Sequence, residues 1–149
     1  MNPIEYSKQK TRDGKTEHEL CKWLRLQNEH DKFQFVWRVI RENAHLGLPL
    51  VEKIQLRTVY LEVILEYGFV YSDVSTIKHW LRATQKGLGL KKIILMVESH
   101  IEDAPLIVDK ALYWLQTDKE KLKEKITNLK KVFEEKHPHY KPISSRGIK

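Results

Sequence analysis

The spacing of apolar residues along the chain predicts helices over most of its length. One stripe recurs at i, i+4, i+7 and i+11, which is the period of a single helix face, and comprises Phe33, Trp37, Ile40 and Ala44. Similar stripes predict six or seven helices, at residues 16–30, 31–46, 49–67, 73–86, 90–101, 104–116 and 118–136. The first two ranges form either two helices or one kinked helix, because no Gly or Pro separates them.

Residues 49–67 are predicted to form the central helix of the core. The preceding segment, 45–49, has the pattern of a helix stop followed by a helix start, since Gly47 suits a C-terminal cap and Pro49 suits a first turn. Two apolar stripes then run along residues 50–67. A helix that is apolar on two sides is buried on two sides, so we expect this helix to contact neighbours on both.

The short connections favour antiparallel helix pairs. These pairs are 31–46 with 49–67, 73–86 with 90–101, and 104–116 with 118–136. The first helix of each pair carries one tryptophan, namely Trp37, Trp80 and Trp114. Pair lengths of about 34–47 residues are typical of helical-repeat arrays. We therefore predict an all-α fold and favour a helical-repeat-like αα-superhelix over a compact orthogonal bundle, although tryptophans that simply fill the core are compatible with both.

Length and composition support a single helical domain. The chain has 149 residues, which is the size of one domain, and its hydrophobic fraction of 41% excludes a wholly disordered chain. Six Gly and five Pro are too few for an all-β domain, which needs a tight turn about every 8–12 residues. We divide the chain into a flexible lead (1–15), the helical domain (16–136) and a basic tail (137–149).

Cysteine content and hydropathy favour a cytoplasmic protein. Cys21 is the only cysteine, so no internal disulfide can form, which argues against a secreted, disulfide-stapled fold. The first 15 residues contain no apolar stretch of the kind that a signal peptide requires. The longest apolar run, Ile93 to Val97, is far shorter than the roughly 20 residues of a membrane span. We expect no contact with a membrane.

The net charge of +7 is concentrated at the two ends of the chain. Residues 1–15 hold four basic and two acidic side chains, and residues 118–149 hold ten and five, whereas 16–117 is neutral. Basic ends attract phosphate without reading sequence. One hypothesis is therefore a nucleic-acid accessory protein whose phosphate-binding residues are Lys119, Lys123, Lys130 and Lys131. No predicted helix shows three or four basic or amide side chains on one exposed face, as a recognition helix does.

The last predicted helix, 118–136, carries a narrow apolar seam. Its members recur at spacings of 4, 3 and 4, as in a coiled coil, and are Leu122, Ile126, Leu129 and Phe133. Such a seam can bind a protein partner or a second copy of the chain. Our leading functional hypothesis is therefore a non-enzymatic protein–protein interaction or adaptor module. The alternative is that the seam packs on the domain's own core.

Residue patterns for catalysis or metal binding are sparse. Glu42 and His45 have the Glu-x-x-His spacing of di-iron bundles, but such sites need a second copy of the motif and the chain has one. Arg38 and His45 have the Arg-to-His spacing of some small helical nucleases, which gives a third hypothesis, a nuclease. Cys21 follows His18 by three residues, without a third group to orient the pair. We assign no catalytic residue, metal site or cofactor.

Overall fold

The chain folds into helices and the turns between them. The structure is a computed structural model and describes residues 2–140. Within that range the elements are α1 (Pro3–Ser7), α2 (Gly14–Arg25), α3 (Glu29–Glu42), α4 (Ala44–Ile54), α5 (Thr58–Tyr71), η1 (Val74–Thr76), α6 (Ile77–Leu88), α7 (Leu90–Ser99), α8 (Pro105–Trp114) and α9 (Glu120–Lys136). The all-α prediction is confirmed, whereas the predicted six or seven helices are too few, because residues 2–140 contain nine α-helices. No helix in this range is long and apolar enough to cross a bilayer.

The predicted central helix, 49–67, is two helices, α4 and α5. Gln55 ends α4 in the left-handed region, at φ 56°. Gly47, which was expected to stop a helix, lies inside α4, and so does Pro49. Gly47 is needed because α3 packs closely on α4 at this point, where a Cβ on Gly47 would lie 2.8 Å from the backbone nitrogen of Ile40. This glycine therefore marks a close contact between helices and not a helix end.

The predicted ranges 16–30 and 31–46, which could have formed one kinked helix, are the two separate helices α2 and α3. Asn28 caps α3 and accepts a hydrogen bond of 2.8 Å from a backbone amide of its first turn. The segment 1–15 contains α1, whose Tyr6 is fully buried. Asn43, at the junction of α3 and α4, donates a hydrogen bond of 3.3 Å to the carbonyl of Ser7, so α1 is tied to the helices that follow.

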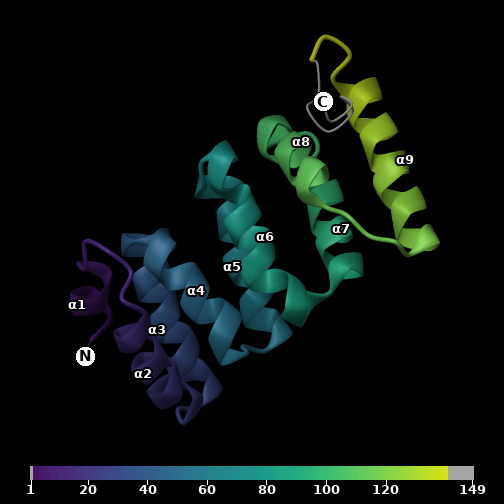
Figure 1. Cartoon of the computed structure of the whole chain (residues 1–149). Coiled ribbons are helices and arrows are strands. Elements are labelled where there is room, and N and C mark those ends of the chain that lie inside the picture. Colours follow the sequence, from purple (N-terminus) through teal and green to yellow (C-terminus); the bar gives the residue numbers. More distant parts are fainter. Residues whose placement is uncertain (1, 141–149) are drawn as a thin grey trace.

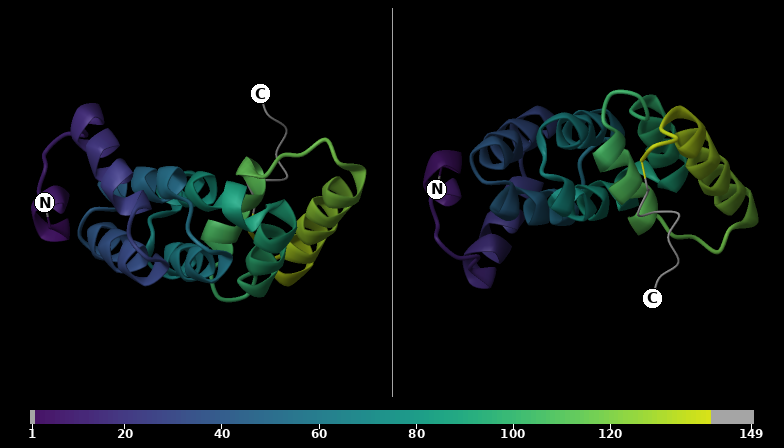
Figure 2. Two further views of the ribbon diagram at one scale, coloured as in Figure 1. Left: turned by 90° about the horizontal axis from the view of Figure 1, so that it is seen from below. Right: turned by 90° about the horizontal axis from the view of Figure 1, so that it is seen from above.

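The helices lie in two rows, shown in Figure 1 and from two further directions in Figure 2. One row is α2, α4, α6 and α8, in which each helix packs directly on the next. The other row is α3, α5, α7 and α9. In it, the rings of Phe33 and Tyr60 stack between α3 and α5 with centroids 4.6 Å apart, Glu62 of α5 pairs with Lys92 of α7, and α7 packs on α9. Contacts of α3 with α4, α5 with α6, and α7 with α8 join the rows.

Helix α9 contributes to the core. Three residues of its seam, Ile126, Leu129 and Phe133, are buried, and Leu122 is half-buried. Because α9 packs on α7 and α8, these side chains face the chain's own helices. The apolar seam of α9 therefore packs against the core of the same molecule, which was the alternative to a seam that binds a partner.

Candidate functional site

Helix α6 presents an exposed face made of basic and amide side chains. At 3.6 residues per turn the face covers an arc of about 120° and consists of Lys78, His79, Arg82, Gln85 and Lys86. The opposite side is buried and consists of Ile77, Trp80, Leu81, Ala83 and Thr84. No acidic residue occurs in this helix, so its charge is uniformly positive.

This face corrects the expectation that no helix carries such a set. The sequence pattern placed the start of this helix at Asp73. In the structure α6 begins at Ile77, and Asp73 caps the preceding turn η1 by accepting a hydrogen bond of 3.2 Å from the amide of Ser75. The carboxylate therefore belongs to the turn, and the helix itself is free of acidic residues.

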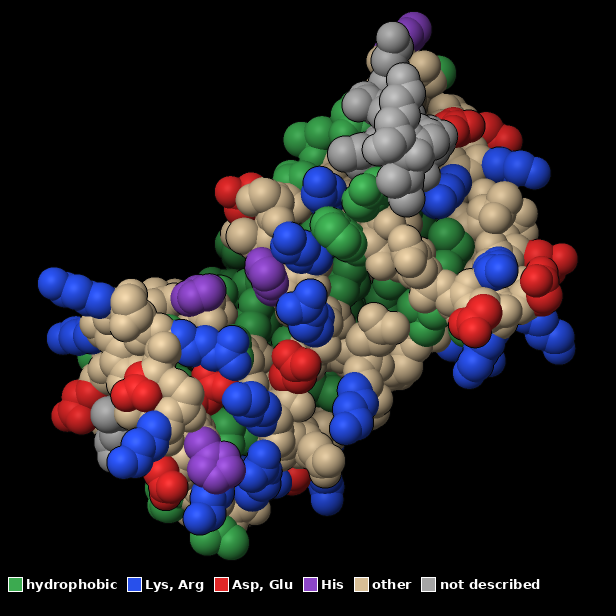
Figure 3. All heavy atoms as spheres, in the orientation of Figure 1, with side chains coloured by type: hydrophobic (Ala, Val, Ile, Leu, Met, Phe, Trp, Pro, Cys, Tyr) green, Lys and Arg blue, Asp and Glu red, His purple; other side chains and the backbone are tan. Residues whose placement is uncertain are grey.

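The positive surface extends beyond α6. Figure 3 shows Lys, Arg and His side chains gathered over α4 and α6 on one face of the molecule. Lys78 lies over the ring of Trp114 in α8, with its ammonium 5.1 Å from the ring centroid. In the other row, the carboxylate of Glu62 is engaged by Lys92 at 3.3 Å. The surface over α4 and α6 is therefore suited to an anionic ligand.

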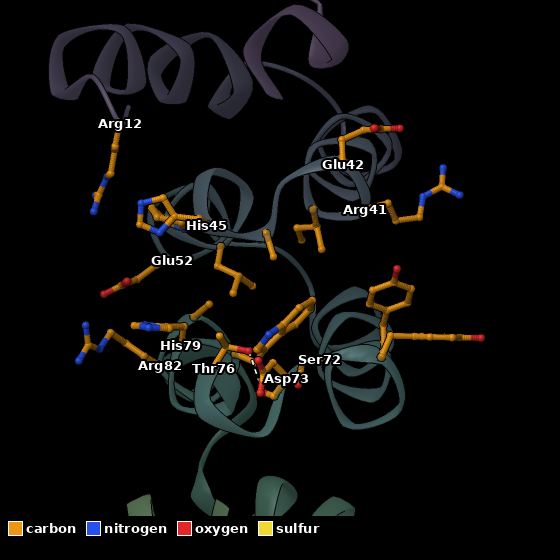
Figure 4. Close-up of a pocket in the computed structure, with 18 residues that line it drawn as sticks. Arg12, Arg41, Glu42, His45, Glu52, Ser72, Asp73, Thr76, His79 and Arg82 are labelled. Atoms are coloured by element: carbon orange, nitrogen blue, oxygen red, sulfur yellow. Dashed lines mark hydrogen bonds between the residues drawn. The ribbon is translucent and has the colours of Figure 1, made fainter. Parts of the chain in front are cut away.

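A pocket of about 530 Å³ opens between α4 and α6, beside this basic face. Figure 4 shows one group of polar side chains along one side of it, namely Arg12, His45, Glu52, His79 and Arg82. We call this side the cationic end. His45 comes from the first turn of α4 and His79 from the first turn of α6. The N-terminal end of a helix carries partial positive charge, which favours an anion nearby.

Arg12 is held at the cationic end by a buried carboxylate. Its Nε and Nη2 atoms donate to the two oxygens of Glu17 at 2.6 and 2.8 Å, and the Glu17 side chain is fully buried. Lys53 of α4 donates to the same carboxylate. The hydrogen bond from Arg12, and then that from Lys53, holds the pKa of Glu17 below its ordinary 4.5 although burial opposes this. Arg82 adds a third cation and Glu52 a second carboxylate, so one positive charge is in excess.

His79 is a neutral group in this positive surrounding. Burial, and then the neighbouring positive charges of which Lys78 is the strongest, lower the pKa of His79 below its ordinary 6.5. The imidazole is therefore uncharged at pH 7, where one ring nitrogen donates a hydrogen bond and the other accepts one. An anion bound beside it would favour the protonated ring.

Aromatic rings line the other side of the pocket. Tyr67 and Tyr71 come from the end of α5 with ring centroids 4.7 Å apart, and Tyr67 lies 5.9 Å from Trp80. Tyr67 also contacts Trp37, whose ring lies 5.7 Å from the Arg41 guanidinium. Figure 4 shows Arg41 across the pocket from Arg12 and its neighbours. We call this side the aromatic end. Tyr71 is its most accessible member, with 71% of its surface exposed.

Two further residues shape the aromatic end. Gly68 lets α5 approach the buried Trp80, since a Cβ on Gly68 would lie 2.8 Å from the Trp80 ring. Ser72 lines the pocket, and its Oγ is buried with no hydrogen-bond partner in the part of the chain from 2 to 140. A buried hydroxyl without a partner is destabilising, so a ligand atom that bonds to Ser72 would remove this penalty.

The residues predicted from the sequence lie apart from this pocket, with two exceptions, Glu42 and His45. His45 lines it, whereas Arg38 lines a separate hollow with Pro3 and Asp31. The predicted phosphate-binding residues all come from α9 or the residue before it, and they are Lys119, Lys123, Lys130 and Lys131. Lys130 is half-buried and the other three are exposed. The described residues contain no group of three or more His, Cys, Asp or Glu side chains that could hold a metal ion.

Sequence reasoning missed Arg12, His79 and Arg82 as site residues. One signal was available, because Lys78, Arg82 and Lys86 recur every four residues without an intervening acid. The contribution of Arg12 had no such signal, since it depends on Glu17 and on the position of α4.

Comparisons with protein-family models, with curated proteins and with solved structures find no match to this chain. Any function assigned to this surface therefore rests on its geometry.

Proposed function

We propose that this protein binds nucleic acid through the exposed face of α6 and the adjoining surface of α4. The observation that carries the proposal is the composition of the α6 face, which is basic and amide throughout with no acid in the helix. Lys and Arg side chains bind phosphate groups, and Gln and His form hydrogen bonds with phosphates, sugars and base edges. This surface replaces the terminal lysines as the favoured contact region.

The charges on α6 are spaced for successive phosphates. Lys78, Arg82 and Lys86 are four residues apart, which is about 6 Å along the helix axis. Each phosphate neutralised releases counterions, so the logarithm of affinity falls with the logarithm of salt concentration by about 0.7 per phosphate for a single strand and 0.9 for a duplex. Three contacts therefore predict a slope of about −2 to −3 from α6 alone.

The test is a salt titration of oligonucleotide binding, followed by fluorescence anisotropy between about 50 and 200 mM salt. The double variant Lys78→Gln/Lys86→Gln removes two charges from α6. We expect it to weaken binding and to reduce the steepness of the slope by about 1.4 for a single strand. The matched control is Lys123→Gln/Lys131→Gln, which removes the same charge from exposed positions of α9, and its slope should equal that of the wild type.

Two results would overturn the proposal. The first is a reduced salt dependence of affinity in the α9 variant together with a wild-type salt dependence in the α6 variant. This result would assign phosphate binding to the lysines of α9, which is the hypothesis drawn from the sequence. Absence of binding at about 50 mM salt, where phosphate contacts are strongest, would remove nucleic acid as the ligand.

We also infer that the helices form a repeat-like αα-superhelix. The supporting observations are the successive packing of α2, α4, α6 and α8, and the contacts of α3 with α4, α5 with α6 and α7 with α8. In such an array each pair is stabilised by its neighbours alone, so the ends unfold separately. Amide hydrogen exchange should then show α8 and α9 opening at lower free energy than α4 to α6. Uniform protection across all helices would favour a compact bundle.

A second candidate function is the interaction module predicted from the sequence. With the α9 seam buried, its support comes from α5, which exposes Val59, Val63 and Val70 at 58, 43 and 55%. These positions, i, i+4 and i+11, lie on one helix face. We propose a second copy of the chain as the occupant. Sedimentation equilibrium should show a dimer that Val63→Asp dissociates, and a monomer at all concentrations would exclude this candidate.

A further inference from the structure

We propose that the pocket between α4 and α6 holds one nucleotide of a single-stranded nucleic acid, with the phosphate at the cationic end and the base at the aromatic end. This inference rests on the proposed function, because the pocket adjoins the α6 face and shares His79 and Arg82 with it. It adds a preference for unpaired strands, which a row of phosphate contacts alone does not provide.

The cationic end matches the charge of a phosphodiester. Its arginines, lysine and carboxylates leave an excess of one positive charge, which equals the single negative charge of that group. Arg82 forms no hydrogen bond or ion pair with any residue in the described range, so its guanidinium is available to a ligand. Arg12 uses Nε and Nη2 for Glu17, which leaves Nη1 for a phosphate oxygen. His45 and His79 supply further hydrogen-bond donors.

The aromatic end has the chemistry that binds a base. Tyr71 offers an exposed ring that packs against Tyr67, and Tyr67 in turn packs against the buried Trp80. Every base has a π face, so stacking on an aromatic side chain binds bases with little dependence on sequence. The Ser72 hydroxyl, buried without a partner among residues 2–140, supplies a donor or acceptor for a polar edge.

The remaining carboxylates fix the orientation of the nucleotide. Figure 4 shows Glu42 on the same side of the pocket as Arg41, away from Arg12. Asp73 lines the pocket near Ser72. Carboxylates repel phosphate and accept hydrogen bonds from the amino groups of bases. The phosphate is therefore directed to the cationic end and the base to the aromatic end.

The size and position of the pocket favour unpaired bases. Its volume of about 530 Å³ lies within the range of about 300–1,000 Å³ of small-molecule sites. A base inside a duplex is stacked and paired, so it cannot enter a pocket without being unstacked at a cost of a few kcal/mol. A base in a single strand is free to turn toward Tyr71.

The first experiment compares two strands of equal charge. A single-stranded oligonucleotide of about eight nucleotides, within the usual site size of single-strand binders, is measured against an abasic strand with the same number of phosphates. Removal of one stacking interaction of this kind lowers affinity by about 5- to 150-fold. We expect the wild type to bind the normal strand more tightly by a factor in this range.

The second experiment uses variants inside and outside the pocket. Tyr71→Ala should lower the affinity for the normal strand and leave that for the abasic strand unchanged. Tyr113→Ala removes an aromatic ring from α8, outside the pocket, and should leave both affinities unchanged. Ser72→Ala should lower the affinity for the normal strand by less than Tyr71→Ala does. Ser75 is a neighbouring serine that does not line the pocket, so Ser75→Ala should leave this affinity unchanged. Tyr71 is largely exposed, so its removal is not expected to unfold the protein, and circular dichroism checks this.

The outcomes separate this inference from the proposed function. Equal affinity of the wild type for the two strands, or a Tyr71→Ala variant that keeps the advantage of the normal strand, would overturn the nucleotide pocket. In that case salt-dependent binding that depends on Lys78 and Lys86 would still support the α6 surface. Absence of binding of either strand at about 50 mM salt would overturn both.

Discussion

Replacing Gly47 with alanine tests how closely α3 and α4 pack. The added Cβ would lie 2.6 Å from Cγ1 of Ile40, 2.8 Å from its backbone nitrogen and 3.0 Å from its Cα. Non-bonded carbon atoms are ordinarily about 3.5–4.0 Å apart. The Ile40 side chain can rotate away from the new methyl group, but its backbone atoms cannot. The two helices must therefore separate at this point by about 0.5–1 Å to restore ordinary contacts.

The cost of this separation exceeds the gain in helix propensity. Overpacking a folded core costs about 1–3 kcal/mol, and a clash with backbone belongs to the upper half of that range. Alanine in the middle of a helix stabilises by about 0.5–1 kcal/mol relative to glycine. We expect the free energy of unfolding to fall by about 1–2 kcal/mol. For a domain of this size the corresponding drop in Tm is about 3–8 °C.

Urea unfolding followed by far-ultraviolet circular dichroism measures this change. The midpoint should fall while the m value stays constant, because the surface exposed on unfolding is unchanged. Gly14→Ala is the matched control, since Gly14 opens α2 and a Cβ there would meet no atom within 4 Å. That variant should be as stable as the wild type or more stable by up to about 1 kcal/mol, through the reduced freedom of its unfolded chain.

Equal stability of the two alanine variants would refute this reasoning. It would mean that α3 and α4 are far enough apart to accept a methyl group, and that Gly47 has no packing role.

Three other predictions concern Glu17 and α9. Glu17→Gln removes the negative charge that pairs with both Arg12 and Lys53. We expect the free energy of unfolding to fall by about 1–2 kcal/mol, which is the lower end for charged hydrogen bonds because both cations are partly solvated. Near-equal urea midpoints of the variant and the wild type would contradict this prediction. Because the folded pKa of Glu17 is depressed, its contribution is complete above the ordinary value of 4.5 and is lost as the pH falls through the folded pKa, so the variant should show a shallower acid limb in stability measured against pH. Phe133→Ala should lower the free energy of unfolding by about 3–5 kcal/mol, since Phe133 is fully buried, whereas a change below about 1 kcal/mol, as is usual for surface positions, would show that α9 is not part of the core.

The amino-acid sequence by itself determined the all-helical class. Helix periodicity depends on residues three and four positions apart, so a stripe such as Phe33, Trp37 and Ile40 is visible without knowledge of the fold. The basic face of α6 is equally local, because Lys78, Arg82 and Lys86 recur every four residues within one helix. Local patterns of this kind are set by neighbouring residues and can be read from the chain.

The tertiary structure alone decided where helices end, what the α9 seam packs on, and which charges meet at the pocket. Gly47 is a residue type that commonly ends helices, but here it lies inside α4 and allows Ile40 of α3 to pack closely on that helix. The pocket joins Arg12 with His45 of α4 and Arg82 of α6, residues that are distant in sequence. Their proximity follows from the packing of α4 between α2 and α6 and from the burial of Glu17. Such long-range contacts depend on how whole helices fit together, which no short-range pattern encodes.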